Sequence, residues 1–309
     1  MLPPAQPSDP PVTPPGLGDP LPATTPWQWR GHRIAWARAG SRDSPDLVLL
    51  IHGFGASLGH WRHTIPALSA QAEVLAMDLL GFGASDKPRS HLADEPAEPG
   101  SVRYGFDLWA EQVVDFLHHQ GRRGRRLHLI GNSVGAVVAL LAALRLQQAG
   151  EPPTQVVLID CAQRTLDRKR LSEQPVLQRW LRPGLMAVVR QRWLLTPLFR
   201  FLARPAFIRQ VLRQAYPSGA HVDPALIALL HGTATEAGAL ESFRGFVNLF
   251  DDHLAPQLLA QLTLPVRMLW GSDDPWEAPA EARRWAVEHP CIRELEVLEG
   301  LGHCPHDEA

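Results

Sequence analysis

The stretch RLHLIGNSVGAVVALLAALRLQQAG, residues 126–150, decides the fold of this chain. Its apolar residues 127–130 predict a buried strand, and the long apolar run 134–146 predicts a helix. Between them stands GNSVG, which matches G-x-S-x-G, a strained turn that exposes a serine hydroxyl. The N-terminus of the following helix can stabilise negative charge. The stretch therefore predicts Ser133 as a nucleophile above a parallel sheet, the alternative being a serine that only caps the helix.

A nucleophilic serine needs two backbone N–H donors for the oxyanion that forms on its substrate. One is expected from Val134, directly after the serine, and the other from a turn that follows an earlier strand. HGFG, residues 52–55, follows the apolar run 47–51, and we assign the second donor to Phe54. His52 has the right chemistry for a base, but its place beside the glycine turn favours a role in shaping that turn.

The catalytic base is expected near the end of the chain, because the partners of such a serine follow in the order Asp and then His. His303 lies in GHC, residues 302–304, directly after the last predicted strand. Imidazole titrates near neutral pH, so it can take and return the serine proton. His306 is the nearby alternative.

The acid that orients this histidine is expected at the end of a strand. Residues 271–275, GSDDP, follow a predicted strand and supply both Asp273 and Asp274, which chemistry alone does not separate. Asp160, at the end of the apolar run 155–159, is a third candidate, although a carboxylate at a strand end is often only a turn residue.

The order of predicted elements indicates one α/β core with an insertion. Strands that alternate with helices predict a mostly parallel sheet with helices on both faces, formed by residues 27–162 and 262–309. Residues 163–261 interrupt the alternation with a helical pattern and predict a cap between two strands. The Pro-rich residues 1–26 are predicted to be disordered.

Three local patterns in the core are specific enough to be checked. Residues 27–40 alternate between apolar and polar and predict a strand pair at a sheet edge. Residues 60–71 predict a helix. FDLWAEQVVDFLHHQG, residues 106–121, predicts an amphipathic helix with Asp107 as N-cap and Gly121 as C-cap.

Composition excludes several classes of function. The net charge is −2 and the pI about 6.7, which gives no indication of nucleic acid as a partner. The sequence GFGAS occurs twice, at residues 53–57 and 81–85. Neither occurrence matches G-x-G-x-x-G or the Walker A pattern, so nucleotide binding is not expected. Neither HExxH nor a His/Cys cluster is present, so no metal or other cofactor is expected. Three cysteines without CxxC predict a reducing, cytoplasmic setting and no disulfide.

The middle of the insertion, residues 178–216, is apolar with recurring arginines and hardly any acids. This pattern is typical of a lid over a hydrophobic substrate pocket, and an apolar pocket indicates a large hydrophobic ester as the small-molecule partner. The same pattern is typical of a basic amphipathic surface in peripheral contact with a membrane. Ordinary packing of the cap helices against the core is the third interpretation.

Five runs of sequence resemble α/β-hydrolases, and the likeness extends over residues 27–308. They are HGFGASLGHWRHTIPAL (52–68), DLLGFGASDKP (78–88), GNSVGA (131–136), LWGSDDPWE (269–277) and GHCPHDE (302–308). More narrowly, the chain resembles the pheophytinase and chlorophyll dephytylase-like hydrolases of photosynthetic organisms.

The resemblance implies an α/β-hydrolase fold and hydrolysis of a carboxylic ester without a metal, with removal of the phytyl chain of a chlorophyll-type pigment as one form of it. It also implies some contact with photosynthetic membranes. Carried over to this sequence, it implies Ser133, Asp274 and His303 as the catalytic residues, with Phe54 and Val134 as the oxyanion donors. The family's acid is the third residue after the Gly of G-x-x-D, which selects Asp274 over its neighbour.

Two departures from the family pattern affect the expectation. Ala136 stands where relatives usually have a second glycine after the nucleophile. The sequence ends six residues after His303, whereas relatives continue into a helix that covers the sheet. We therefore expect the final C-terminal helix to be missing, an apolar face to be exposed and the His303 loop to be weakly anchored.

Three hypotheses of function follow from the sequence. The first is a serine hydrolase that cleaves a hydrophobic ester through an acyl-enzyme. The second is a C–C bond hydrolase of the meta-cleavage-product type, which acts on small aromatic dienoic acids. The third is a hydrolase homologue that binds a ligand without turning it over, since a fold does not establish an activity. Dehalogenases and epoxide hydrolases of this fold use an Asp nucleophile, so Ser133 argues against them.

Overall fold

The computed structural model describes residues 21–121 and 124–309. Residues 1–20 of the segment predicted to be disordered lie outside the described residues. An eight-stranded sheet has the strand order β1-β2-β4-β3-β5-β6-β7-β8. β1 and β2 pair antiparallel, as do β2 and β4, and the other neighbours are parallel. The strands are β1 (Thr25–Trp29), β2 (His32–Ala39), β3 (Asp46–Ile51), β4 (Glu73–Met77), β5 (Arg126–Asn132), β6 (Gln155–Ile159), β7 (Val266–Gly271) and β8 (Ile292–Leu298). The predicted mostly parallel sheet is confirmed.

The predicted strand pair at the sheet edge is confirmed as β1 and β2, but the disordered segment was predicted to extend too far. Thr25 and Pro26 already belong to β1, where they pair with Trp36 and Ala35. Proline lacks an N–H, and an edge strand tolerates this because only one side of the strand needs a partner. The indole of Trp29 donates to Asp115 Oδ2 at 2.8 Å, which ties the edge to the helix below it.

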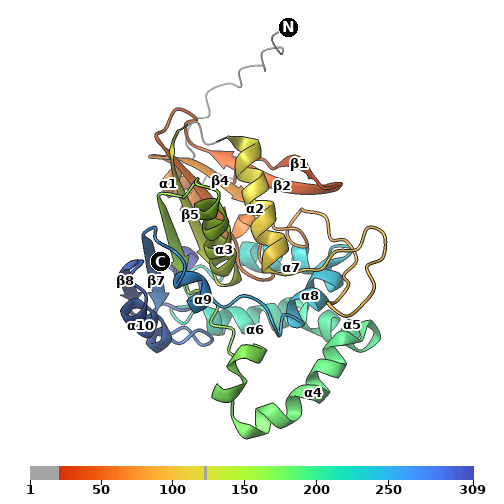
Figure 1. The fold of residues 1–309 in the computed structure, drawn as a ribbon. Helices are drawn as coiled ribbons and strands as arrows, with labels where there is room; N and C mark the ends of the chain where they lie inside the picture. Colours follow the sequence, from red (N-terminus) through yellow and green to blue (C-terminus); the bar gives the residue numbers. More distant parts are fainter. Residues whose placement is uncertain (1–20, 122–123) are drawn as a thin grey trace.

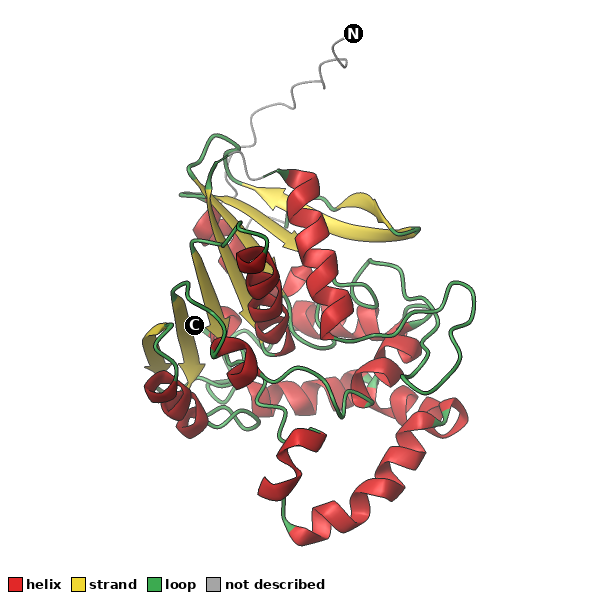
Figure 2. Ribbon diagram, viewed as in Figure 1, coloured by secondary structure: helices red, strands yellow, loops and turns green. Residues whose placement is uncertain are grey.

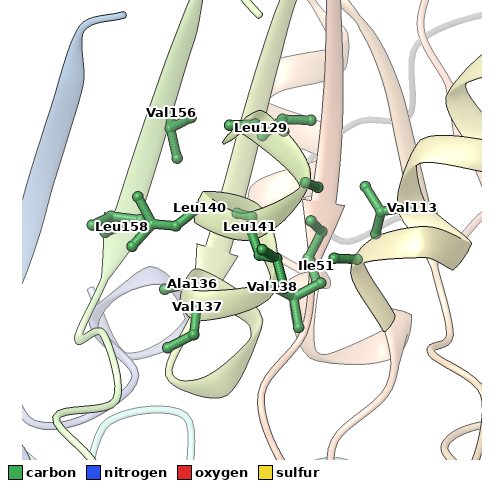
Figure 3. Close-up of a cluster of buried hydrophobic side chains, with 14 of the residues drawn as sticks. Ile51, Val113, Leu129, Ala136, Val137, Val138, Leu140, Leu141, Val156 and Leu158 are labelled. Carbon is green, nitrogen blue, oxygen red and sulfur yellow. The ribbon is translucent and has the colours of Figure 1, made fainter. Parts of the chain in front are cut away.

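One face of the sheet carries the main hydrophobic core. It is covered by α2 (Phe106–Gln120), α3 (Val134–Gln148), α9 (Ala255–Leu259) and α10 (Pro279–Glu288). Twelve of the fifteen residues of α3 are buried, which explains a helix that is apolar nearly all round. Figure 3 shows strand and helix side chains meeting there, among them Ile51, Val113, Leu129, Ala136, Val137, Val138, Leu140, Leu141, Val156 and Leu158.

The opposite face has a smaller core, formed with the short elements η1 (Leu58–Trp61) and α1 (Thr64–Ser69). The single helix predicted for residues 60–71 is therefore wrong. The Ser57 hydroxyl accepts from Gly59 N and starts a 3₁₀ turn, and a new helix then begins two residues before Pro66, where a missing N–H costs nothing. Ile130, Val157 and Leu269 point to this side and are only partly buried.

The ends of α2 confirm one predicted cap and correct the other. Gly121 follows the last helical residue at φ 72°, as predicted. At the other end Gly105 is the N-cap, and Asp107 lies inside the first turn, where it pairs with Arg145. The amide of Phe106 is instead satisfied by Asp252 Oδ2 at 3.2 Å, a distant residue that sequence spacing could not indicate.

Every regular element that the structure describes between β6 and β7 is helical. These elements are η2 (Arg168–Glu173), α4 (Val176–Arg190), α5 (Arg192–Leu202), α6 (Pro205–Ala215), α7 (Pro224–Thr235), α8 (Ala239–Val247) and α9. In Figure 1 and Figure 2 the helices α4 to α6 lie beyond the carboxyl ends of the strands, with α4 farthest from the sheet. α9 packs on α3 and so belongs to the core, although its residues fall inside the predicted cap segment. Among the described residues, no helix combines the length and hydropathy required to cross a bilayer.

Candidate active site

Ser133 occupies the sharp turn between β5 and α3. Its φ of 55° and ψ of −120° are strained for a residue with a side chain, and such strain persists only where the surroundings enforce it. Its amide donates to Ile159 O at 2.9 Å. A Cβ at Gly131 would collide with the backbone of Gly135, and one at Gly135 would collide with His52 and Ile51 carbonyls. The two glycines therefore let three backbone segments pack closely beneath the serine.

Asp274 and His303 meet at the ends of β7 and β8. His303 Nδ1 donates to Asp274 Oδ2 at 2.7 Å, and both residues are buried. Asp274 Oδ1 accepts from the amides of Trp276 and Glu277 at 2.8 and 3.1 Å. Burial alone would raise the pKa of Asp274, but the bond from His303 and these amides outweigh it and lower the pKa. Asp273 is exposed and, within the described part of the chain, its carboxylate accepts from the Ser272 hydroxyl alone, so the geometry separates the two aspartates.

Backbone contacts bring His303 to the serine turn. Asn132, the residue before the serine, donates from Nδ2 to His303 O at 3.1 Å. The amide of His303 donates to Ala215 O in the cap at 2.9 Å, and Trp276 packs edge-on against the imidazole at 4.9 Å between ring centroids. Within the described residues, no hydrogen bond joins the Ser133 hydroxyl to His303 Nε2, whereas His303 Nδ1 is bonded to Asp274.

The two alternative histidines have other surroundings. His52 is fully buried, its Nδ1 is bonded to Gly53 O at 2.7 Å, and its Nε2 accepts from Leu79 N at 3.1 Å. Burial lowers its pKa to about 4, so it stays neutral and holds the turn. His306 packs against His60 and Trp61, and burial lowers its pKa well below the usual value. Among residues 21–121 and 124–309, no carboxylate pairs with either histidine.

Asp160, the third candidate acid, lies against Asp274. Its Oδ1 accepts from Gly271 N at 3.0 Å, and the residue is completely buried. Burial first, and then the charge of Asp274, raise its pKa well above the usual value. Ligand atoms of Asp160, Asp274 and His303 lie within 4.8 Å of one another, a spacing that suits a metal, but His303 Nδ1 is already directed at Asp274. We interpret Asp160 as a neutral neighbour of the Asp–His pair.

The two proposed oxyanion donors face no competing acceptor. Among the described residues, neither the amide of Phe54 nor that of Val134 donates a hydrogen bond, so both remain available. The Phe54 ring stacks on Phe246 with 3.8 Å between ring centroids and meets Phe82 edge-on at 5.9 Å. Phe246 comes from the cap helix α8, a contact that no local sequence signal indicates.

A cavity of about 270 Å³ opens beside Phe54, between the core and the cap helices α5 to α8. Its polar side chains are the hydroxyls of Thr233 and Ser242, and none of the described residues that line it is charged. Its apolar lining includes Phe54, Phe82, Phe199, Leu202, Phe207, Ile208, Val211, Leu212, Leu230 and Phe243. A larger cavity of about 820 Å³ lies under α4 and is lined by none of the candidate site residues, whereas Phe54 is the one of them that lines the smaller cavity within the described part of the chain.

The His303 loop is firmly held, contrary to the expectation from the short C-terminal segment. It runs into α11 (Pro305–Glu308), where Glu308 accepts from Gly302 N at 2.7 Å and from Ser218 N at 2.9 Å. Asp307 is fully buried and accepts from Arg62 Nε at 2.8 Å and from the Tyr216 hydroxyl at 3.0 Å. These acids tie the loop to both core and cap, and sequence reasoning missed them because their partners are far apart in the chain.

Of the three cysteines, Cys304 lies in the His303 loop, where its carbonyl accepts from the amides of Asp307 and Glu308 at 2.9 Å. Cys161, Cys291 and Cys304 are buried free thiols, so the expected absence of disulfides among them is confirmed. Burial raises the pKa of the Cys304 thiol well above its usual value, which keeps it protonated and unreactive beside His303.

Known proteins share this fold and sequence pattern. Mesoderm-specific transcript protein of Mus musculus is 34% identical over 122 residues, 39% of this chain and 33% of that protein. A 2-hydroxy-6-oxo-6-(2'-aminophenyl)hexa-2,4-dienoic acid hydrolase of Metapseudomonas resinovorans is 35% identical over 96 residues, 30% of this chain and 29% of that protein. The chain thus aligns with only about a third of the length of these curated relatives.

The solved structure of epoxide hydrolase CorEH superposes with a TM-score of 0.72 over 93% of both chains, at 21% identity. That likeness shows the fold alone. A sequence model of the alpha/beta hydrolase family matches residues 48–309, which include most of β3, the serine turn and both residues of the Asp–His pair. With this match over most of its length, and with the sheet and turn described above, the chain belongs to the alpha/beta hydrolase family.

Proposed function

We propose that the protein is a serine hydrolase that cleaves a carboxylic ester of a hydrophobic substrate through an acyl-enzyme on Ser133. The observation that carries this proposal is the strained serine turn beside a buried His303–Asp274 pair with 2.7 Å between Nδ1 and Oδ2. Nucleophile, base and orienting acid in this chain order are the combination that activates a serine hydroxyl.

The proposed reaction has two halves. In the first, His303 Nε2 takes the Ser133 proton as the serine oxygen bonds to the ester carbonyl carbon, and the amides of Phe54 and Val134 stabilise the oxyanion. The ester C–O bond then breaks, and the alcohol leaves with the proton from His303. In the second half, water gives a proton to His303 and attacks the acyl carbon, which releases the acid and restores Ser133. Asp274 keeps Nδ1 protonated and stabilises the imidazolium throughout.

The substrate class follows from the cavity beside Phe54. A lining of aromatic and aliphatic side chains, with two hydroxyls and no charge, favours an alkyl or isoprenoid chain over a small polar group. Removal of a phytyl chain from a chlorophyll-type pigment is one reaction of this class, and it is the one suggested by the sequence resemblance. A phytyl ester is therefore included among the substrates to be tested.

The experiment is labelling with a fluorophosphonate probe, followed by hydrolysis of p-nitrophenyl esters of increasing acyl length and of a phytyl ester. We expect the wild type to be labelled, Ser133→Ala to be unlabelled, and the exposed control Ser172→Ala to behave as wild type. We also expect long-chain esters to be preferred over acetate. Labelling that survives in Ser133→Ala would refute the proposed nucleophile, and a folded wild type without labelling would favour a binding-only homologue.

A second candidate is hydrolysis of a C–C bond in a dienoic acid. It is favoured by the 96-residue similarity to the dienoic acid hydrolase, a protein whose substrate carries a carboxylate. The absence of a cation among the described residues that line the 270 Å³ cavity argues against it, because a carboxylate taken into such a pocket would be unpaired. Turnover of an aromatic dienoate that exceeds turnover of long-chain esters would make this the better assignment.

A further inference from the structure

The middle of the cap carries positively charged side chains and no acidic ones. Residues 174–216, which include α4, α5 and α6, contain eight arginines and no Lys, Asp or Glu. Arg190 and Arg192 are paired with Asp94 and Glu241 from outside this segment. Within the described residues the exposed Arg200, Arg204 and Arg209 have no ion pair. The outer part of the cap is therefore a positively charged surface.

Helix α4 leaves most of its apolar side chains in solvent. Only Val189 of its fifteen residues is buried, whereas Trp180 is 80% exposed. The side toward the protein is mixed: Arg182 Nη2 reaches Phe250 O at 3.5 Å, Arg190 pairs with Asp94 at 2.6 Å, and Trp180 and Met186 border the cavity of about 820 Å³. A helix of a globular protein normally buries its apolar side against the core. The outer apolar side chains of α4 are instead 50–67% exposed: Leu177, Leu181 and Leu185.

Helix α5 continues this pattern next to α4, with which it is in contact. Trp193 is 73% exposed, and Phe201 is exposed with the Arg204 guanidinium 5.4 Å from its ring centroid. The opposite side of α5 contributes Phe199 and Leu202 to the cavity beside the candidate active site. We call six of the exposed apolar side chains of the two helices the cap stripe: Leu177, Trp180, Leu181, Leu185, Trp193 and Phe201.

We propose that the cap stripe docks on a lipid bilayer with anionic headgroups. Tryptophan and arginine suit the bilayer interface, where the ring enters the boundary of the acyl chains while the guanidinium meets phosphate. The eight arginines without an acid complement a negatively charged surface. A second copy of the chain fits less well, because two like-charged caps would face each other. Docking of this kind is peripheral and does not depend on the proposed hydrolysis.

The test is cosedimentation of the full chain with vesicles of phosphatidylcholine alone and of phosphatidylcholine mixed with phosphatidylglycerol. We expect binding to the mixed vesicles that weakens as salt is added. Trp180→Glu with Trp193→Glu should abolish it, and Arg200→Glu with Arg204→Glu should weaken it by at least about fivefold for each arginine. Ser133→Ala should bind as wild type, which separates docking from catalysis.

Two matched controls lie on α10, away from the cap. Val287→Glu places a charge on an 88% exposed apolar residue, and Arg283→Glu reverses an exposed arginine. Both should bind vesicles as wild type, and thermal unfolding should show all variants folded. Equal binding by the tryptophan variant would overturn the proposal. The proposal would also be overturned if the wild type formed a dimer in analytical ultracentrifugation, did not bind vesicles, and became monomeric in the tryptophan variant. A second copy of the chain would then cover the cap stripe.

Discussion

Replacing Asp307 with alanine should destabilise the fold strongly, although this residue stands two positions from the end of the chain. The carboxylate is completely buried and accepts two bonds from Arg62, at 2.8 and 3.1 Å, and one from the Tyr216 hydroxyl at 3.0 Å. Removing one member of a buried ion pair typically costs about 3–5 kcal/mol, because the other charge is left uncompensated.

We expect the lower end of that range, about 3 kcal/mol, for Asp307→Ala. Arg62 would keep two partners, Asp223 Oδ2 at 2.8 Å and His221 O at 2.7 Å. The measurement is the free energy of unfolding in urea. A matched control is Glu111→Ala, which breaks an exposed pair with Arg30 and should cost well under about 1 kcal/mol.

The double variant Arg62→Ala with Asp307→Ala completes a thermodynamic cycle. If the pair acts as described, the two single losses should not add, and the coupling should be between about 1.5 and 3 kcal/mol. A loss below about 1 kcal/mol for Asp307→Ala, or additive single effects, would refute the view that this carboxylate anchors the loop of His303. In that case the anchoring would come from Glu308 and the backbone bonds alone.

Three other predictions concern the site and its support. Asp274→Asn should reduce kcat for a long-chain ester by about 10³–10⁴-fold through loss of the correct imidazole tautomer, while Asp273→Asn should leave it unchanged. Burial raises the pKa of Glu277 to about 8. The neutral carboxyl therefore makes its full contribution to the free energy of unfolding below about pH 4.5, and this contribution is lost as the pH rises through 8. Urea unfolding from pH 5 to 9 should show Glu277→Gln gaining about 2–4 kcal/mol over wild type at the alkaline end, and parallel curves would contradict this. Gly135→Ala should lower the free energy of unfolding in urea by more than about 2 kcal/mol, because the new methyl group would collide with backbone carbonyls. The control Gly184→Ala has open space around it and should raise that free energy slightly. Equal effects of the two substitutions would contradict the close packing under the serine.

Local sequence signals predicted most of the core. The apolar run before GNSVG and the helix after it could be read directly, and the turn glycines identified Ser133 without other information. Sequence order alone pointed to His303, since few histidines follow a strand near the chain end. The residues themselves did not separate Asp273 from Asp274, and the choice of Asp274 came from the family resemblance. The physical difference appears only in the folded chain, where Asp273 is exposed and Asp274 accepts the imidazole N–H.

The features that sequence reasoning missed depend on contacts that residue patterns do not show, either between distant residues or within a short turn. Arg62 and Asp307 are 245 residues apart, and no spacing rule connects them. The helix expected over residues 60–71 is divided because the Ser57 hydroxyl starts a 3₁₀ turn. Composition left three interpretations of residues 178–216 open, because it does not say which side chains of α4 face the protein, and most of its apolar side chains are exposed.

The helical insertion leaves the sheet at one strand and returns at its neighbour. β6 and β7 pair in parallel register from Val156 with Val266 to Ile159 with Leu269, whatever lies between them in sequence. We expect a chimaera that exchanges α4 to α8 with the corresponding helices of another family member, and keeps α9 in the core, to retain the sheet and the serine turn. Such a graft must still supply a carbonyl where Ala215 receives the amide of His303. The lining of the cavity beside Phe54 can thus change by exchange at two neighbouring strand ends, while the sheet beneath it stays the same.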